Sequence, residues 1–148
     1  MGRVRRYLTD REVQASNDST RRIPLPKSGK LSAIDLRIEC TNGSTSGTEQ
    51  LVDAIDRVEV VDGSWPMFSA AGRVSYAWAS LFGKARPPQG RTQAASAVQE
   101  LLLRIHFGYN IWDKEHYLDL ARFQNPELAI QFSPTISATT FATGTFTI

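Results

Sequence analysis

The stretch "LSAIDLRIECT" at residues 31–41 decides the fold, because its side chains alternate strictly in type. Apolar residues take the even positions and polar residues take the odd ones: Ile34, Leu36, Ile38 and Cys40 alternate with Asp35, Arg37, Glu39 and Thr41. Successive side chains of an extended strand point to opposite faces of a sheet. A period of two therefore predicts a strand with one face in a core and the other toward water or a neighbouring molecule.

Other segments repeat this pattern. In "AVQELLLRIHFGY" (97–109) the odd positions from Leu101 to Phe107 are apolar, and "ELAIQF" (127–132) directs Leu128, Ile130 and Phe132 inward. The segment "AIDRVEVVDGSWPMFS" (54–69) is typical of a hairpin. Its Asp62-Gly63 pair suits a tight type I′ turn, which requires positive φ angles.

Proline positions indicate which strands lie at sheet edges. Pro24 and Pro26 interrupt "RRIPLP" (21–26), and Pro66 interrupts the return strand of the hairpin. Proline has no amide hydrogen to donate to a neighbouring strand, so both segments are predicted to be edge strands or short ones.

One segment changes period. In "AAGRVSYAWASLFG" (70–83), Val74, Trp78 and Leu81 or Phe82 recur at helical spacing, and Gly83 could end the helix. The chain is thus predicted to be all-β: a jelly-roll β-sandwich or barrel of about eight strands, with one short helix and a basic N-terminal arm.

Length and charge set the domain organisation. The 148 residues suit one domain, and we expect an arm at 1–19, with at most a short element, followed by a single domain at 20–148. The net charge is +2, but residues 1–30 hold eight Lys or Arg and three acids, which leaves the rest at −3. The arm contributes Arg3, Arg5, Arg6 and Arg11. It is either a contact for an anionic partner, such as nucleic acid or lipid headgroups, or a solvated terminus.

Candidate catalytic groups are sparse. Two histidines, His106 and His116, and one cysteine, Cys40, are too few for a jelly-roll metal site of the cupin kind, and Cys40 is predicted to be a core residue. The carboxylate pairs Asp53/Asp56 and Asp113/Glu115 are interpreted as solvated, and no Ser-His-Asp motif is present. We therefore expect a protein that is not an enzyme, with no cofactor, metal or small-molecule substrate.

The tryptophans leave a further interpretation open. Core packing is the default for Trp65, Trp78 and Trp112. Exposed tryptophans would instead favour a β-sandwich module that binds glycans or a receptor, such as a spike or carbohydrate-binding domain.

The order of several motifs resembles the jelly-roll major capsid proteins of tailless icosahedral phages. These belong to the vertical jelly-roll lineage, with double-jelly-roll coats and paired single-jelly-roll coats. The matching segments cover roughly residues 20–148 and follow in the family's order: "IPLPKSGKLSAIDLRIEC"; a hairpin with a V-x-DGS turn (Val60, Asp62, Gly63, Ser64); and a Leu-Asp-x-x-x-Phe segment before P-E-L (Leu118, Asp119, Phe123, then Pro126, Glu127, Leu128).

The resemblance implies a structural subunit of a viral (phage) icosahedral capsid. Such a subunit forms homo-oligomers, as trimers or pseudo-hexameric capsomers, and contacts other capsid proteins. It would reside in the virion and be made in the host cytoplasm. The basic arm would face the interior, toward a membrane or the genome. Loops 42–50 and 83–96 would supply lateral and apical contacts, and Asp35, Arg37 and Glu39 would form a lateral contact face.

The final segment "TTFATGTFTI" (139–148) is predicted to be the closing strand of the sandwich, with Ala142, Gly144, Phe146 and Ile148 on one face. In the resembling double-barrel coats, a linker and a second barrel follow such a strand. The expectation is that Ile148 ends a single-barrel subunit or marks a cut before a second barrel.

Overall fold

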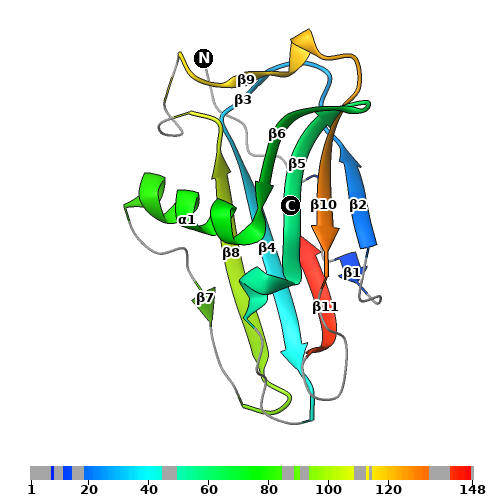
Figure 1. Ribbon diagram of the computed structural model, residues 1–148, viewed down its shortest axis with the longest axis vertical. Helices are drawn as coiled ribbons and strands as arrows, with labels where there is room; N and C mark the ends of the chain where they lie inside the picture. Colours follow the sequence, from blue (N-terminus) through cyan, green and yellow to red (C-terminus); the bar gives the residue numbers. More distant parts are fainter. Residues whose placement is uncertain are drawn as a thin grey trace.

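The computed structural model describes residues 8, 12–14, 19–44, 50–84, 89–90, 94–108, 113, 115–133 and 141–147. Within these residues the chain forms eleven strands, several of them very short, one α-helix and two 3-10 helices. Two antiparallel sheets face each other and enclose the core (Figure 1). The predicted all-β sandwich with one helix is confirmed.

The first sheet, called sheet A, runs in the order β1-β11-β4-β8-β7. Its strands are β1 (Glu12–Gln14), β4 (Ala33–Asn42), β7 (Gln89–Gly90), β8 (Val98–His106) and β11 (Phe141–Thr147).

The second sheet, called sheet B, runs in the order β2-β10-β5-β6. Its strands are β2 (Ser19–Pro24), β5 (Ile55–Asp62), β6 (Trp65–Ala71) and β10 (Pro126–Phe132). A small pairing of β3 (Lys30–Leu31) with β9 (Leu118–Asp119) lies at one end of the sandwich (Figure 1). The helices are η1 (Leu51–Ala54), α1 (Gly72–Gly83) and η2 (Leu120–Arg122).

The core lies between the two sheets and consists of the residues that the alternation predicts to face inward. Leu36 in β4 and Leu101 and Leu103 in β8 are fully buried, opposite Val58 in β5 and Leu128 in β10 from sheet B. Each such side chain contributes about 1.5–3 kcal/mol by leaving water. The predicted inward faces of the strands at 31–41, 97–109 and 127–132 are therefore confirmed.

The predicted edge strands are also confirmed. Strands β2 and β6 are the two outer strands of sheet B, and they contain Pro24 and Pro66 respectively. At these positions the missing amide hydrogen of proline removes no bond from the interior of the sheet.

The β5–β6 hairpin differs from its prediction at the turn. Asp62 pairs with Trp65, so the two turn residues are Gly63 and Ser64, one position later than expected. Gly63 has a φ of 63°, whereas Ser64 is not among the described residues with positive φ. Glycine at the first turn position with positive φ fits a type II′ turn, so the predicted type I′ turn at Asp62-Gly63 is wrong.

Helix α1 closes one open side of the sandwich. It packs beside β6 of sheet B and β8 of sheet A, and its first turn rests on η1 and the start of β5 (Figure 1). Its inward face consists of the small residues Gly72, Ser75 and Ala79. Small side chains allow the helix backbone to approach the strands closely, and Gly72 is the extreme case, since a Cβ there would overlap the carbonyl oxygen of Ile55.

The opposite side of the sandwich is formed by β1 and β2 (Figure 1). Strand β1 belongs to the segment predicted as an arm, and it pairs with β11 through Glu12, Val13 and Gln14. The closing strand predicted at the C-terminal end exists as β11, which lies inside sheet A between β1 and β4. Ile148 and the arginines Arg3, Arg5, Arg6 and Arg11 lie outside the described residues.

The close approach at Gly72 predicts a destabilising effect of one methyl group. Gly72→Ala should lower the free energy of unfolding by about 1–3 kcal/mol, because the backbone of Ile55 and Val52 surrounds the new Cβ. Urea denaturation followed by circular dichroism measures this change. Gly83→Ala on the same helix is the control. Its Cβ meets nothing within 4 Å, so stability should stay equal or rise slightly. Equal effects of the two variants would contradict the packing.

Candidate assembly surfaces

The outer face of sheet A carries a cross-strand row of charges. Antiparallel pairing places Asp35 of β4 directly opposite Arg104 of β8. The Arg104 guanidinium donates to both carboxylate oxygens of Asp35, with Nη2 2.7 Å from Oδ2. This two-point contact fixes the geometry of both side chains, and the hydrogen bond to Asp35 raises the pKa of Arg104.

Arg37 lies one step along the same face. Its guanidinium contacts Glu39 on its own strand, and its Nε lies 2.7 Å from Oε1 of Glu100 on β8. The side chain remains 48% exposed. Exposed ion pairs of this kind contribute about 0–1 kcal/mol to folding, so this charged row is better suited to orient a contact than to hold the chain together.

The structure thus places Asp35, Arg37 and Glu39 together on one outward face, as the alternation predicts. It adds Arg104 and Glu100 as their partners within the chain. These two residues occupy outward positions of the alternation in β8, but sequence alone does not give the strand register that pairs them. Their role as a lateral contact face stays a prediction.

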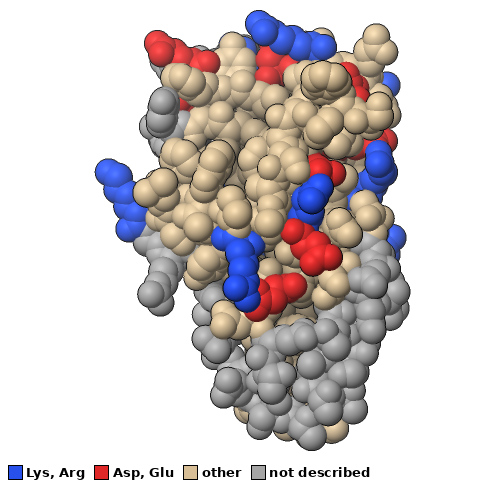
Figure 2. Space-filling view, in the orientation of Figure 1, with Lys and Arg blue, Asp and Glu red and all other residues tan. Residues whose placement is uncertain are grey.

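A second surface lies on the outer side of α1. Val74, Trp78 and Leu81 are 48%, 49% and 71% exposed, and their spacing sets them in one stripe along the helix. We call these three residues the α1 stripe. Figure 2 shows that uncharged side chains cover much of the area where α1 and β6 lie in Figure 1, with charged groups around it.

A row of aromatic rings supports the α1 stripe from below. Trp78 packs against Phe68 of β6 and Phe82 of α1, with ring centroids 6.4 and 5.9 Å apart. The row continues from Phe68 to Phe107 at 5.7 Å and from Phe82 to His106 at 6.0 Å. Burial, and secondly the nearby Arg104, lowers the pKa of His106, which keeps its ring neutral within this apolar row.

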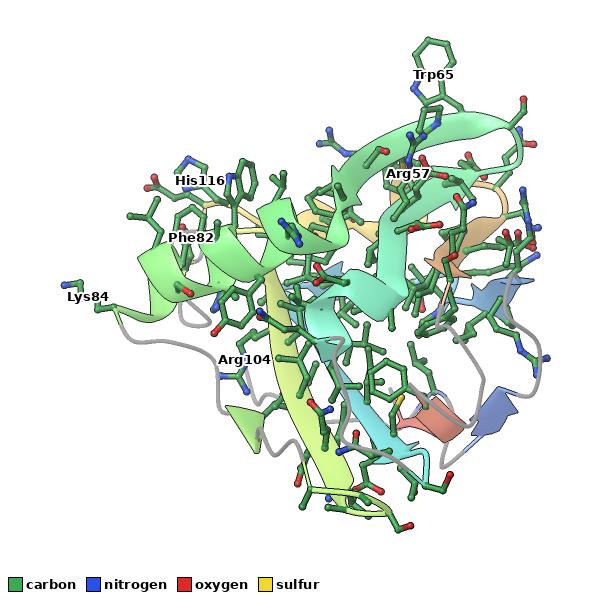
Figure 3. All side chains as sticks on the ribbon, turned by 60° about the horizontal axis from the view of Figure 1, so that its bottom comes forward. Arg57, Trp65, Phe82, Lys84, Arg104 and His116 are labelled. Atoms are coloured by element: carbon green, nitrogen blue, oxygen red, sulfur yellow. The ribbon has the colours of Figure 1, made fainter. Side chains whose placement is uncertain are left out.

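The default prediction of core packing is wrong for two tryptophans. Trp65 is 75% exposed and points away from the molecule at the tip of the β5–β6 hairpin (Figure 3). Trp78 is half exposed on the α1 stripe. Trp112 lies outside the described residues. The inward face of α1 consists of the small residues Gly72, Ser75 and Ala79, which also recur at helical spacing. This second pattern, of small residues, was the sequence signal that the larger residues face outward.

Asp62 anchors the hairpin tip to the segment before β10. Its Oδ1 accepts a hydrogen bond of 2.7 Å from the amide of Asn125, and its Oδ2 accepts one of 3.2 Å from the amide of Gln124. The aspartate of the V-x-DGS motif therefore ties two loops together at this end of the sandwich. The hairpin tip that carries Trp65 is held in place by these hydrogen bonds.

The groups considered for catalysis do not form a reaction centre. Within the described part of the chain, no cluster of three or more His, Cys, Asp or Glu residues could hold a metal ion. Asp53 pairs with Arg73 at 2.6 Å. Asp113 was expected to be solvated, but its side chain is only 10% exposed and it accepts bonds from the amides of Glu115 and His116 and contacts the His116 ring. Its carboxylate therefore caps a turn.

Cys40 is buried between the sheets, as predicted. Burial raises the pKa of its thiol to about 12. Among the helices that the structure describes, none has the length and hydropathy of a membrane-spanning segment. About half of the loops 42–50 and 83–96, which were expected to supply contacts, falls outside the described residues, namely residues 45–49, 85–88 and 91–93.

Comparison with known proteins finds a match in structure. No protein-family model and no curated protein sequence matches this chain. A solved structure, the "Crystal Structure of the STIV MCP", superimposes with a TM-score of 0.62 and 14% sequence identity. The match covers 97% of this chain and 46% of the other, so this chain spans about half of the length of that major capsid protein. The fold is accordingly a jelly roll, as predicted.

The burial of Cys40 predicts an unreactive thiol and a pH dependence. A thiol-reactive disulfide reagent at pH 8 should label the native chain very slowly and the urea-unfolded chain at one thiol per molecule. Because the folded pKa lies above the ordinary value of 9.0, the unfolded chain loses the proton first. The contribution of Cys40 to the free energy of unfolding is thus present below pH 9 and declines toward pH 12. Cys40→Ala should lack this decline, and rapid labelling of the native chain would contradict the burial.

Proposed function

We propose that this chain is a structural subunit of an icosahedral viral capsid. The observation that carries the proposal is the jelly-roll match with a viral major capsid protein over 97% of the chain. The described surface supports it in a second way. It offers a charged strand face and an apolar helix face, both of which suit contacts between subunits. Of the candidate catalytic groups, Asp53 is engaged in an ion pair and Asp113 in a turn.

In the proposed arrangement the strands stand roughly perpendicular to the shell, as in the vertical jelly-roll lineage of tailless phages. Subunits then meet through their sides in trimers or pseudo-hexameric capsomers. The outer face of sheet A, with Asp35, Arg37 and Glu39, is one such side. The basic arm with Arg3, Arg5, Arg6 and Arg11 faces the interior, toward a membrane or nucleic acid, and the protein resides in the virion.

One observation favours a second candidate function. Trp65 is 75% exposed at a hairpin tip that Asp62 holds in place, and an exposed aromatic ring is a common platform for sugars. A β-sandwich module that binds glycans or a receptor would use this tip. Saturable glycan binding that Trp65→Ala abolishes would support this alternative. If the chain binds no glycan on an array, the glycan-binding function is excluded.

The capsid proposal predicts self-assembly. Purified chain should elute in size-exclusion chromatography as a trimer or larger ring, and electron microscopy should show capsomers or shells at high concentration. The contacts are many and individually weak, so assembly should increase steeply with concentration. A strictly monomeric species under all conditions, with no rings or lattices in the images, would contradict the proposal.

The lateral contact face predicts a charge-sensitive step in assembly. Arg37→Glu should reduce the assembled fraction about tenfold or more, because four acidic groups would then crowd the face around Glu39 and Glu100. The folded monomer should lose only about 1 kcal/mol, since exposed ion pairs contribute little. Light scattering measures assembly, and thermal unfolding measures stability.

Arg57→Glu is the matched control for this test. Arg57 lies on the outer face of sheet B and pairs with Glu59 two residues along β5, just as Arg37 pairs with Glu39. It is similarly exposed, at 58%. If both reversals impair assembly equally, the outer face of sheet A has no particular role in the contact.

A further inference from the structure

Three of the five large apolar side chains that are exposed in the described residues form the α1 stripe. Leu81 alone is 71% exposed, and Trp78 and Val74 continue the stripe along the same side of the helix. The helix contains no acidic residue, and its one basic residue, Arg73, precedes the stripe. Contiguous exposed apolar residues on a rigid element are typical of a protein–protein contact.

The position of α1 in the sandwich indicates what the stripe would face in a shell. The helix lies along a side of the sandwich, between its two ends, and closes the gap between β6 and β8 (Figure 1). With the strands upright in a shell, this side faces a neighbouring subunit and neither the interior nor the exterior. This step rests on the proposed function.

A head-to-tail contact would place the α1 stripe against the opposite side of the next copy. The described part of that side carries the exposed charged residues Arg21 and Arg22 of β2, and Arg22 pairs with Glu127 at 3.2 Å. An apolar stripe gains little against a charged edge, because its guanidinium groups would lose water without polar partners in return. The charge distribution therefore disfavours this pairing.

A second copy of the same stripe is the better match. We propose that the α1 stripe docks on the α1 stripe of a second copy of this chain, in a two-fold symmetric contact centred near Ala77 and Trp78. In such a contact the same patch serves both partners. Apolar side chains of one copy then contact apolar side chains of the other. In each copy the Trp78 ring is held by packing against Phe68 and Phe82.

The charges at the rim agree with this arrangement. A two-fold axis near the middle of α1 sets the end of one helix opposite the start of the other. Lys84 at the helix end is exposed and forms no ion pair that the described residues show. It would approach Asp53, which sits beside the start of α1 and is bound to Arg73 at 2.6 Å. At each rim the Asp53 carboxylate, whose side chain is 30% exposed, would then lie between Arg73 of its own chain and Lys84 of the other copy (Figure 3 shows Lys84 at the tip of α1).

Sedimentation of the purified chain tests the contact. Leu81→Lys should weaken dimerisation at least tenfold, because both copies would carry a charge into the apolar centre. Lysine suits the last turn of a helix, so the variant should fold. Trp65→Lys, on an apolar residue of the β5–β6 hairpin tip that is 75% exposed and lies outside the stripe, is the control and should dimerise as the original chain does. Equal dimerisation by both variants would overturn the proposal.

Cross-linking tests the symmetry of the contact. Ala77 is exposed on α1 between the three stripe residues, and the native Cys40 is buried, so Ala77→Cys adds one accessible thiol. Mild oxidation should yield a disulfide-linked dimer, since only a two-fold contact brings position 77 of two copies together. Gly83→Cys, at the helix end, should not cross-link.

The outcomes separate this contact from the capsid role. If Leu81→Lys dimerises as the original chain does and Ala77→Cys gives no disulfide-linked dimer, while capsomers still form, the contact between α1 stripes is wrong and the capsid role stands. If capsomers never form but the Ala77→Cys dimer does, the stripe contact stands and the capsid role fails.

Discussion

The antiparallel register between β4 and β8 is the constraint on which the rest of the structure depends. Nine residue pairs join these strands, from Ala33 with His106 to Thr41 with Val98. Because side chains alternate, a shift by one residue would turn every core residue of one strand outward. The same register that buries Leu36 beside Leu103 therefore also sets Asp35 against Arg104 on the outer face. The buried core and the charged row therefore both result from the register of β4 with β8.

Sequence alone predicts those features that depend on local alternation and on backbone chemistry. The inward faces of three strands, the edge positions of Pro24 and Pro66, the helix that ends at Gly83 and the burial of Cys40 all follow from patterns within a few residues. Features set by distant pairing do not follow in this way. No local signal tells that Arg104 meets Asp35, 69 residues away, or that Asp62 receives the amides of Gln124 and Asn125.

The helix shows why hydrophobicity alone misassigns a surface. Val74, Trp78 and Leu81 have the spacing of a buried face, but α1 must fit tightly against η1 and β5, where only Gly72 and other small residues have room. Steric space therefore decides which face turns inward, and the large apolar residues remain outside. An outward face with this composition is costly for a monomer, and it is consistent with a protein whose working form is an assembly.

We propose that this jelly roll stands upright in a shell and meets its neighbours through its sides. A cryo-electron microscopy map of the assembled particles, at a resolution that traces strands, tests it most directly. We predict that the strands of both sheets run roughly perpendicular to the shell, with sheet A's outer face at a subunit boundary. Sheets lying flat in the shell, or Arg37 facing open solvent in every subunit, would contradict the claim.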